Sequence, residues 1–216
     1  MSGRLAGVLA SSHVAAAGSV SVVETTSNGA SNGDAVDLTF ASSPGDLVLI
    51  GSSVGAQPAS VVGPSSSSGW TALVNSDGFA VFWKVMPSPT EATVTMPEQG
   101  GGRSGNAHAL IVLSGANSTS PIHNSASSMN AATPDPPSVT TVNNGAVVTF
   151  CGARAVQVST APTGYTNFTS AYSVDTNRGA IAMAVKTGMT GATEDPGEFT
   201  GDTPLQSDLA TISITP

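Results

Sequence analysis

The chain has 216 residues, enough for one large β-sandwich or two small domains. Charged residues make up only 9%, well below the ~25% of ordinary soluble domains, and the formal net charge is −8. The few lysines and arginines are scattered without a basic patch, which argues against nucleic-acid binding through phosphates. Apolar runs recur along the whole chain, so we expect a folded protein and not a disordered one.

The first segment, residues 1–18, has a short apolar stretch at Leu5–Ala10 that faintly resembles a signal peptide. It is too short to cross a bilayer, and no run of about 18 apolar residues occurs elsewhere, so no membrane span is expected. We expect residues 1–18 to form an N-terminal arm, which is either helical over 5–17 or an extended arm that is exposed or bound to a partner. Residues 19–216 are expected to form a single β-sandwich domain.

Strand signals dominate the rest of the chain, because short runs rich in β-branched residues alternate with clusters of Gly, Pro, Asn and Ser. Many short strands separated by tight turns predict an antiparallel all-β sandwich or barrel. The expected strands are 19–24, 34–40, 46–52, 70–74, 79–86, 91–96, 107–114, 138–142, 145–151, 165–174, 179–187 and 208–214. Long loops are expected at 53–69, 97–106 and 115–137.

The strand at 179–187 has two different faces. Ile181, Met183 and Val185 share one face and predict a core contact, because side chains alternate along a strand. The other face holds only alanines and is available to a second layer or to a neighbouring molecule. The candidate partner contacts are Ala180, Ala182 and Ala184.

The two halves of the chain repeat the same order of features at offsets of 95 to 101 residues. The matched segments are Gly45–Ile50 with Asn144–Thr149, Gly69–Thr71 with Gly164–Thr166, Gly78–Val85 with Gly179–Lys186, and Leu110–Leu113 with Leu209–Ile212. A period of about 100 residues is too long for a solenoid and suits two half-sandwiches that share one core. The sequence therefore predicts two related halves, the first at about 40–115 and the second at about 138–214.

One motif resembles a serine-hydrolase nucleophile elbow, Gly51–Gly55, with Ser53 at its centre. Asp77 and His108 could complete a triad in the order found in hydrolases. No amphipathic helix follows the motif, and such matches arise easily in a chain rich in Ser and Gly. We therefore expect no enzyme activity.

The glycine-rich segment Gly100–Gly105 matches a dinucleotide-binding pattern, but a strand and not a helix is expected after it. The three histidines, His13, His108 and His123, show no metal-ligand spacing. No cofactor or metal is expected. The acidic loop 194–202 favours a solvated loop over a calcium site, and the single cysteine, Cys151, is expected to be buried.

Two aromatic residues follow a glycine at corresponding positions of the two halves, Trp70 and Tyr165. They could be structural, or they could be exposed at a loop rim and stack on a sugar. Both readings stay open at this point.

The succession of strands resembles small jelly-roll-like structural proteins of tailed bacteriophages and related gene-transfer particles. The segments that carry this resemblance are Gly45–Ile50, Gly69–Thr71, Phe82–Val85, Glu91–Met96, Leu110–Gly115 and Gly164-Tyr165. It covers roughly residues 40–214 and includes no catalytic signature.

The resemblance implies a non-enzymatic structural protein of the virion that decorates or stabilises the capsid surface. The alternative is a receptor- or glycan-binding module of a head spike, fibre or tail tip. Either role implies other virion proteins as partners and a homo-oligomer, and the second adds a host-surface glycan. No nucleic-acid partner is expected.

Overall fold

The computed structural model describes residues 18–31, 33–55, 60–65, 68–99, 105–154, 156–173, 178–202 and 207–216. Within these ranges the chain is all β, with no helix, and its sheets are antiparallel. The predicted N-terminal arm lies outside the described residues, apart from Gly18. The predicted all-β, antiparallel sandwich is confirmed.

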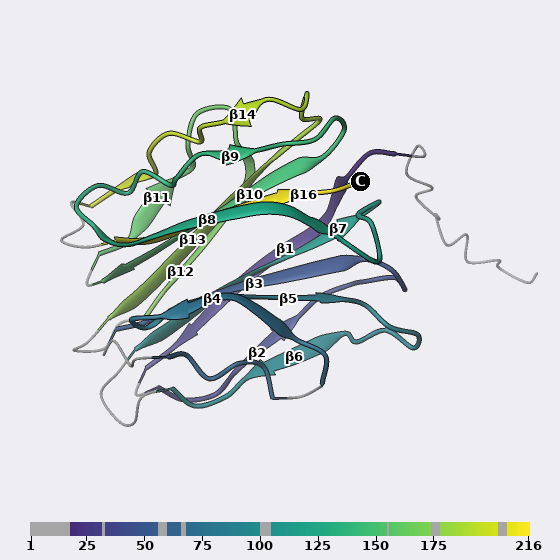
Figure 1. Ribbon diagram of the computed structural model, residues 1–216. Coiled ribbons are helices and arrows are strands. Elements are labelled where there is room, and N and C mark those ends of the chain that lie inside the picture. Colours follow the sequence, from purple (N-terminus) through teal and green to yellow (C-terminus); the bar gives the residue numbers. More distant parts are fainter. Residues whose placement is uncertain are drawn as a thin grey trace, which may run out of the picture.

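Two five-stranded sheets form the centre of the molecule (Figure 1). The first sheet has the order β1 (Ser21–Ala30), β7 (Asn106–Ser114), β3 (Leu47–Val54), β5 (Phe79–Val85) and β4 (Thr71–Ser76). The second has the order β8 (Ile122–Ala131), β16 (Ser207–Ile214), β10 (Ala146–Arg154), β13 (Gly179–Thr187) and β12 (Thr166–Tyr172). Each sheet is built from one half of the chain.

Three two-stranded sheets lie outside this pair. They are β2 (Val36–Thr39) with β6 (Thr93–Met96), β9 (Val139–Thr140) with β14 (Thr193–Glu194), and β11 (Val158–Thr160) with β15 (Thr200–Gly201). In Figure 1, β2 and β6 lie below the first sheet, whereas β9, β11 and β14 lie above the second.

Every central strand has buried side chains on both of its faces. These side chains form three apolar clusters that hold the layers together. The shared core lies between the two five-stranded sheets and contains Leu49, Phe79 and Ile111 from the first with Phe150 and Ile181 from the second. A second cluster joins the first sheet to β2 and β6. The third joins the second sheet to the segments around β9, β11 and β15. The molecule is thus a four-layered body.

The two halves have the same topology. In each half the first strand pairs with the last, β1 with β7 and β8 with β16. The second strand pairs in the outer layer with the strand that follows the central hairpin, β2 with β6 and β9 with β14. The third strand pairs with the strand that leads into this layer, β3 with β5 and β10 with β13, and the second half adds the pair β11 and β15. This nested antiparallel pairing is jelly-roll-like. Even a β-bulge recurs, between Val22 and Glu24 on β1 and between Ile122 and Asn124 on β8. The predicted relation between the halves therefore extends to strand order and to a local irregularity.

The strand pairings correct two details of the predicted match. Val48 and Val147 face Lys84 and Lys186, so these two lysines are equivalent. Leu110 faces Ile50, and Thr211 faces Thr149. Because Ile50 and Thr149 are equivalent, the counterpart of Leu110 is Thr211 and not Leu209.

The predicted crossing loop at 115–137 is wrong, because its centre forms the ten-residue strand β8. Each half also begins earlier than residues 40 and 138, since the edge strands β1 and β8 belong to the two sheets. β8 has few apolar residues, and it is held by pairing with β16 along most of its length.

Candidate functional site

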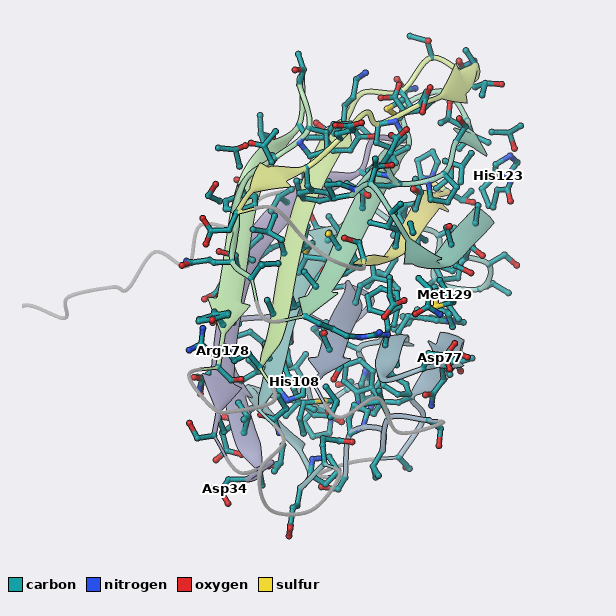
Figure 2. The ribbon with its side chains drawn as sticks, turned by 90° about the vertical axis from the view of Figure 1, so that its left-hand side faces the viewer. Asp34, Asp77, His108, His123, Met129 and Arg178 are labelled. Atoms are coloured by element: carbon teal, nitrogen blue, oxygen red, sulfur yellow. The ribbon has the colours of Figure 1, made fainter. Side chains whose placement is uncertain are left out.

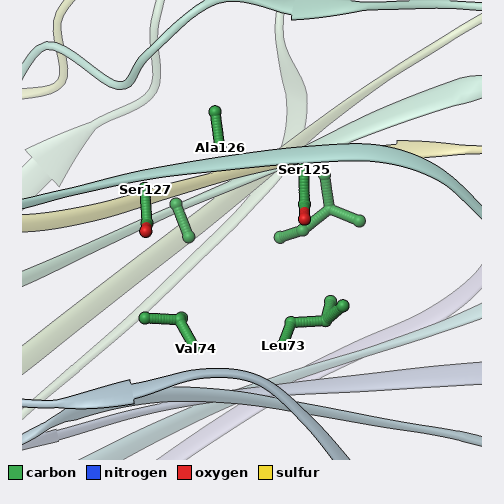
Figure 3. Close-up of a pocket in the computed structure, with 7 residues that line it drawn as sticks. Leu73, Val74, Ser125, Ala126 and Ser127 are labelled. Atoms are coloured by element: carbon green, nitrogen blue, oxygen red, sulfur yellow. The ribbon is translucent and has the colours of Figure 1, made fainter.

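A groove lies at one lateral edge of the sandwich, where β4 of the first sheet faces β8 of the second (Figure 3). Its volume is about 220 Å³. Leu73 and Val74 form one wall, and Ser125 and Ser127 point toward them from the other. Ala126, Ala210 and Ile212 complete the lining, which contains no charged side chain.

The shape of the groove follows from the local structure of its two walls. On β4 the register shifts between Ala72 and Val74, so Leu73 lies in a bulge. Leu73 and Val74 consequently both pack against the shared core. On β8 the side chains alternate, and Ala126 turns away to pack against the third cluster. The two serines are therefore left facing the groove.

At the opposite lateral edge, the strands equivalent to β8 and β4 are joined by hydrogen bonds. There β1 lies beside β12, and Ser27 Oγ donates a hydrogen bond to the backbone oxygen of Ser170 at 2.9 Å. The Thr169 hydroxyl donates to Ser27 Oγ, also at 2.9 Å. The two halves are thus bonded to each other along this edge.

Strand register identifies the counterparts of these residues at the groove. Ser27 and Ser127 face the equivalent residues Ala109 and Ala210, so they occupy equivalent positions. Val74 faces Val81 on β5, and Thr169 faces Met183 on β13. Because Val81 and Met183 are equivalent, Val74 takes the place of Thr169. A valine cannot donate a hydrogen bond to a serine. No strand pairing joins β4 to β8 in the described part of the chain, and the edge stays open.

A polar cluster ties the two halves together near the end of this open edge. Arg154 donates hydrogen bonds to Asp208 at 3.0 Å and to the backbone oxygen of Asp77 at 3.2 Å. The backbone N–H of Asn130 donates to the second carboxylate oxygen of Asp208 at 2.8 Å. Burial raises the pKa of Asp208, against the lowering effect of the Asn130 N–H and of Arg154. This cluster fixes the turn between β4 and β5 against the second sheet.

The three residues of the possible hydrolase triad are not brought together. Ser53 faces the shared core, where it lies against Gly152 of the other sheet. His108 faces the outer cluster instead, because its neighbours Ala107 and Ala109 are in the shared core. Figure 2 shows Asp77 well apart from His108, on the turn between β4 and β5. No nucleophile–base pair forms from these residues.

The predicted loop aromatics belong to two equivalent clusters. In the first half the Lys84 ammonium lies 5.8 Å from the ring centre of Trp70 and forms an ion pair with Glu91. In the second half Lys186 lies 6.0 Å from the ring centre of Tyr165 and pairs with Glu194 at 2.8 Å.

The two aromatic rings differ in exposure. Tyr165 is buried, and its hydroxyl donates to Glu194 at 3.2 Å. Burial and the neighbouring Glu194 carboxylate both raise the pKa of Tyr165. Trp70 is only half-buried, so it is the more exposed of the two aromatic residues.

The alanine-lined face of β13 is covered by the chain itself. Ala180, Ala182 and Ala184 are at most 1% exposed and belong to the third cluster, beneath the outer layer of the second half. Of the two possibilities that the sequence left open, the second layer is the one formed. These alanines are therefore not available to a partner in the folded chain.

The remaining candidates that the structure describes do not assemble a further site. His123 is exposed on β8, and Cys151 is fully buried, which raises the pKa of its thiol to about 12. His13 and most of the glycine-rich segment, residues 100–104, lie outside the described residues. Glu194 of the acidic loop is engaged by Lys186 and Tyr165.

In the described ranges no three His, Cys, Asp or Glu side chains are placed to hold a metal ion. The same residues include no helix that is long and apolar enough to cross a membrane. No family model matches the chain, and no significant match was found among curated proteins or solved structures.

The sequence did not point to the groove, because one of its walls was expected to be a loop. A signal was nevertheless present. Asn124–Ser128 could have been aligned with Glu24–Asn28 once the second half was extended upstream by a similar offset.

Proposed function

We propose that the chain is a non-enzymatic structural protein of a bacteriophage particle, where it decorates or stabilises the capsid surface. The open edge between β4 and β8 is the observation that carries this proposal. Its groove is small, uncharged and partly apolar, which suits contact with another protein better than binding of a charged substrate. The partner is another virion protein, and the decorating unit is an oligomer of this chain.

Three properties support a structural role. The possible nucleophile Ser53 and the histidine His108 point to opposite sides of one sheet, so acyl-transfer chemistry has no assembled base. The described surface strands carry few charges, as the whole chain does, which reduces the cost of packing many copies side by side. The jelly-roll-like pairing within each half agrees with the resemblance to phage structural proteins.

Locating the chain in purified, nuclease-treated particles from a producing host tests this role. Immunogold labelling would show many copies spread over the head if the chain decorates the capsid. Absence of the chain from purified particles would contradict the proposal.

A second candidate function is a receptor- or glycan-binding module, and it is favoured by Trp70. This ring is half-buried and follows Gly69, whose φ of 91° turns the chain at the loop end. Labelling confined to the vertices or the tail tip would support this role. Loss of cell-surface binding in Trp70→Ala, but not in Tyr165→Phe, would then assign the contact to Trp70, because the Tyr165 ring is buried.

A further inference from the structure

His108 is a buried histidine without a hydrogen-bonding partner among the described residues. Both of its ring nitrogens are inaccessible and unpaired. Its cross-strand neighbour on β3 is Ser52, whose hydroxyl is also buried and unpaired. An unpaired polar group in an apolar interior costs free energy, and a charged one would cost far more. Burial accordingly lowers the pKa of His108 to about 3.

The second half shows that the fold does not require a histidine here. Cys151 takes the position of Ser52, and Leu209 takes the position of His108. Both residues belong to the third apolar cluster. One half therefore carries a polar, titratable pair where the other carries an apolar one.

The side of the sheet that holds His108 is covered by β2 and β6. Leu110 and Val112, on the same side of β7, pack in the cluster that includes Val36 and Met96. Two hydrogen-bonded contacts attach this layer near His108. Asn106 donates to the backbone oxygen of Asp34 at 2.9 Å. Gln99 donates from its backbone N–H to Gly33 at 2.8 Å.

A third contact continues the same attachment. The Gln99 side chain donates to the backbone oxygen of Val62 at 2.7 Å and accepts from its N–H at 2.8 Å. Each contact is a neutral hydrogen bond, so a charge that appears beneath the layer meets no compensating carboxylate among them.

We propose that protonation of His108 releases the β2–β6 layer of the first half, so that acid exposes the apolar face beneath it while the second half stays closed. The charged imidazolium gains hydration only when this layer separates from the sheet. The outer layer of the second half covers Leu209, which has no titratable group. That layer is therefore not released by acid.

The other charged groups around this side of the sheet do not offer His108 a counterion. Glu24 accepts from the N–H of Ala41, and Lys84 and Glu91 pair with each other. The remaining titratable groups on the packed elements are the largely buried Asp46 before β3 and the exposed Asp34, Asp37 and Glu98 on the covering layer. A variant that changes only His108 and keeps these carboxylates separates the effect of the imidazole from theirs.

The direction of the effect follows from proton linkage. The pKa of His108 is lower in the closed state than the ordinary value of 6.5, so the open state binds more protons in acid. The stability of the closed layer is complete above pH 6.5 and falls as the pH drops from there toward 3. Between pH 7 and pH 4.5 the open fraction is expected to rise roughly 100-fold.

Hydrogen exchange measured by mass spectrometry tests the proposal on the full chain, with rates corrected for the intrinsic effect of pH. Amides of β2 and β6 should lose protection roughly 100-fold between pH 7 and pH 4.5, and those of β9 and β14 should not. His108→Leu, which copies the second half, should abolish this difference. The carboxylates are unchanged in that variant and serve as the internal control. Leu209→His should confer acid sensitivity on the β9–β14 layer.

His108→Gln provides a second non-titrating variant if the leucine packs poorly, and it should give the same loss of acid response. Equal acid sensitivity in wild type and both variants would overturn the proposal. Simultaneous loss of protection in both outer layers of the wild type would also overturn it, because the event would then be global unfolding.

Discussion

Gly51 and Phe150 occupy equivalent positions in the two halves, and they lie against each other at the centre of the shared core. A Cβ added to Gly51 would lie 2.3 Å from the ring of Phe150. Their equivalence follows from their pairing with Ala109 and Ala210, which correspond in the two sheets. The relation between the halves therefore breaks down at this contact, where one half supplies a large ring and the other the space for it.

Gly51→Ala should destabilise the protein by about 1–3 kcal/mol, because the new methyl overpacks the shared core. The cost should fall to near zero in a Phe150→Ala background, where the ring is absent, although that background is itself less stable. Urea unfolding of the four proteins gives the coupling free energy. An equal cost of Gly51→Ala in both backgrounds would contradict the contact.

The two lysine–carboxylate pairs offer a matched comparison between the halves. The Lys84 side chain is 8% exposed, whereas that of Lys186 is 38% exposed. Glu91→Gln should therefore cost about 3 kcal/mol, because it leaves a buried ammonium without its carboxylate. Glu194→Gln should cost less than about 1 kcal/mol, because water solvates Lys186. Thermal unfolding of the two variants checks the order, and equal losses would contradict it.

Cys151 provides a chemical probe of the closed second half. The thiolate is the reactive form, and burial raises the pKa of this thiol to about 12, so little thiolate is present at pH 8. Iodoacetamide should modify the native chain on the order of 100-fold more slowly than the chain in concentrated urea. Similar rates in the two conditions, followed by mass spectrometry, would show that the third cluster is not closed.

Most strands were predictable because their sequences alternate or stay apolar over the length of a strand. β8 was not, since it is mostly polar and its serines face a groove instead of a core. Its existence depends on pairing with β16, which lies far along the chain. The relation between the halves was visible from turns and aromatic residues, but its register at β7 and β16 was not.

The candidate site was missed for the same reason. Leu110 and Leu209 are both leucines, and the sequence therefore suggested that they correspond. The strand pairings show instead that Thr211 is the counterpart of Leu110. Without the correct register, Ser127 cannot be matched to Ser27, and the missing bond across the open edge cannot be recognised. The exposure of Ala182 was likewise undecidable, because its cover comes from short segments with weak strand signals.

In the proposed role, the open edge between β4 and β8 is the surface that contacts another virion protein. Ser127→Cys places an exposed thiol in the groove, and the native Cys151 is buried. Thr39→Cys places one on the outer layer of the first half as a matched control. The rate of maleimide labelling is then compared between the free chain and purified particles.

We expect particle assembly to slow labelling at Ser127→Cys at least tenfold, whereas Thr39→Cys should keep the rate that it has in the free chain. Unchanged labelling at Ser127→Cys in particles that contain the chain would contradict the assignment of this edge as the docking surface.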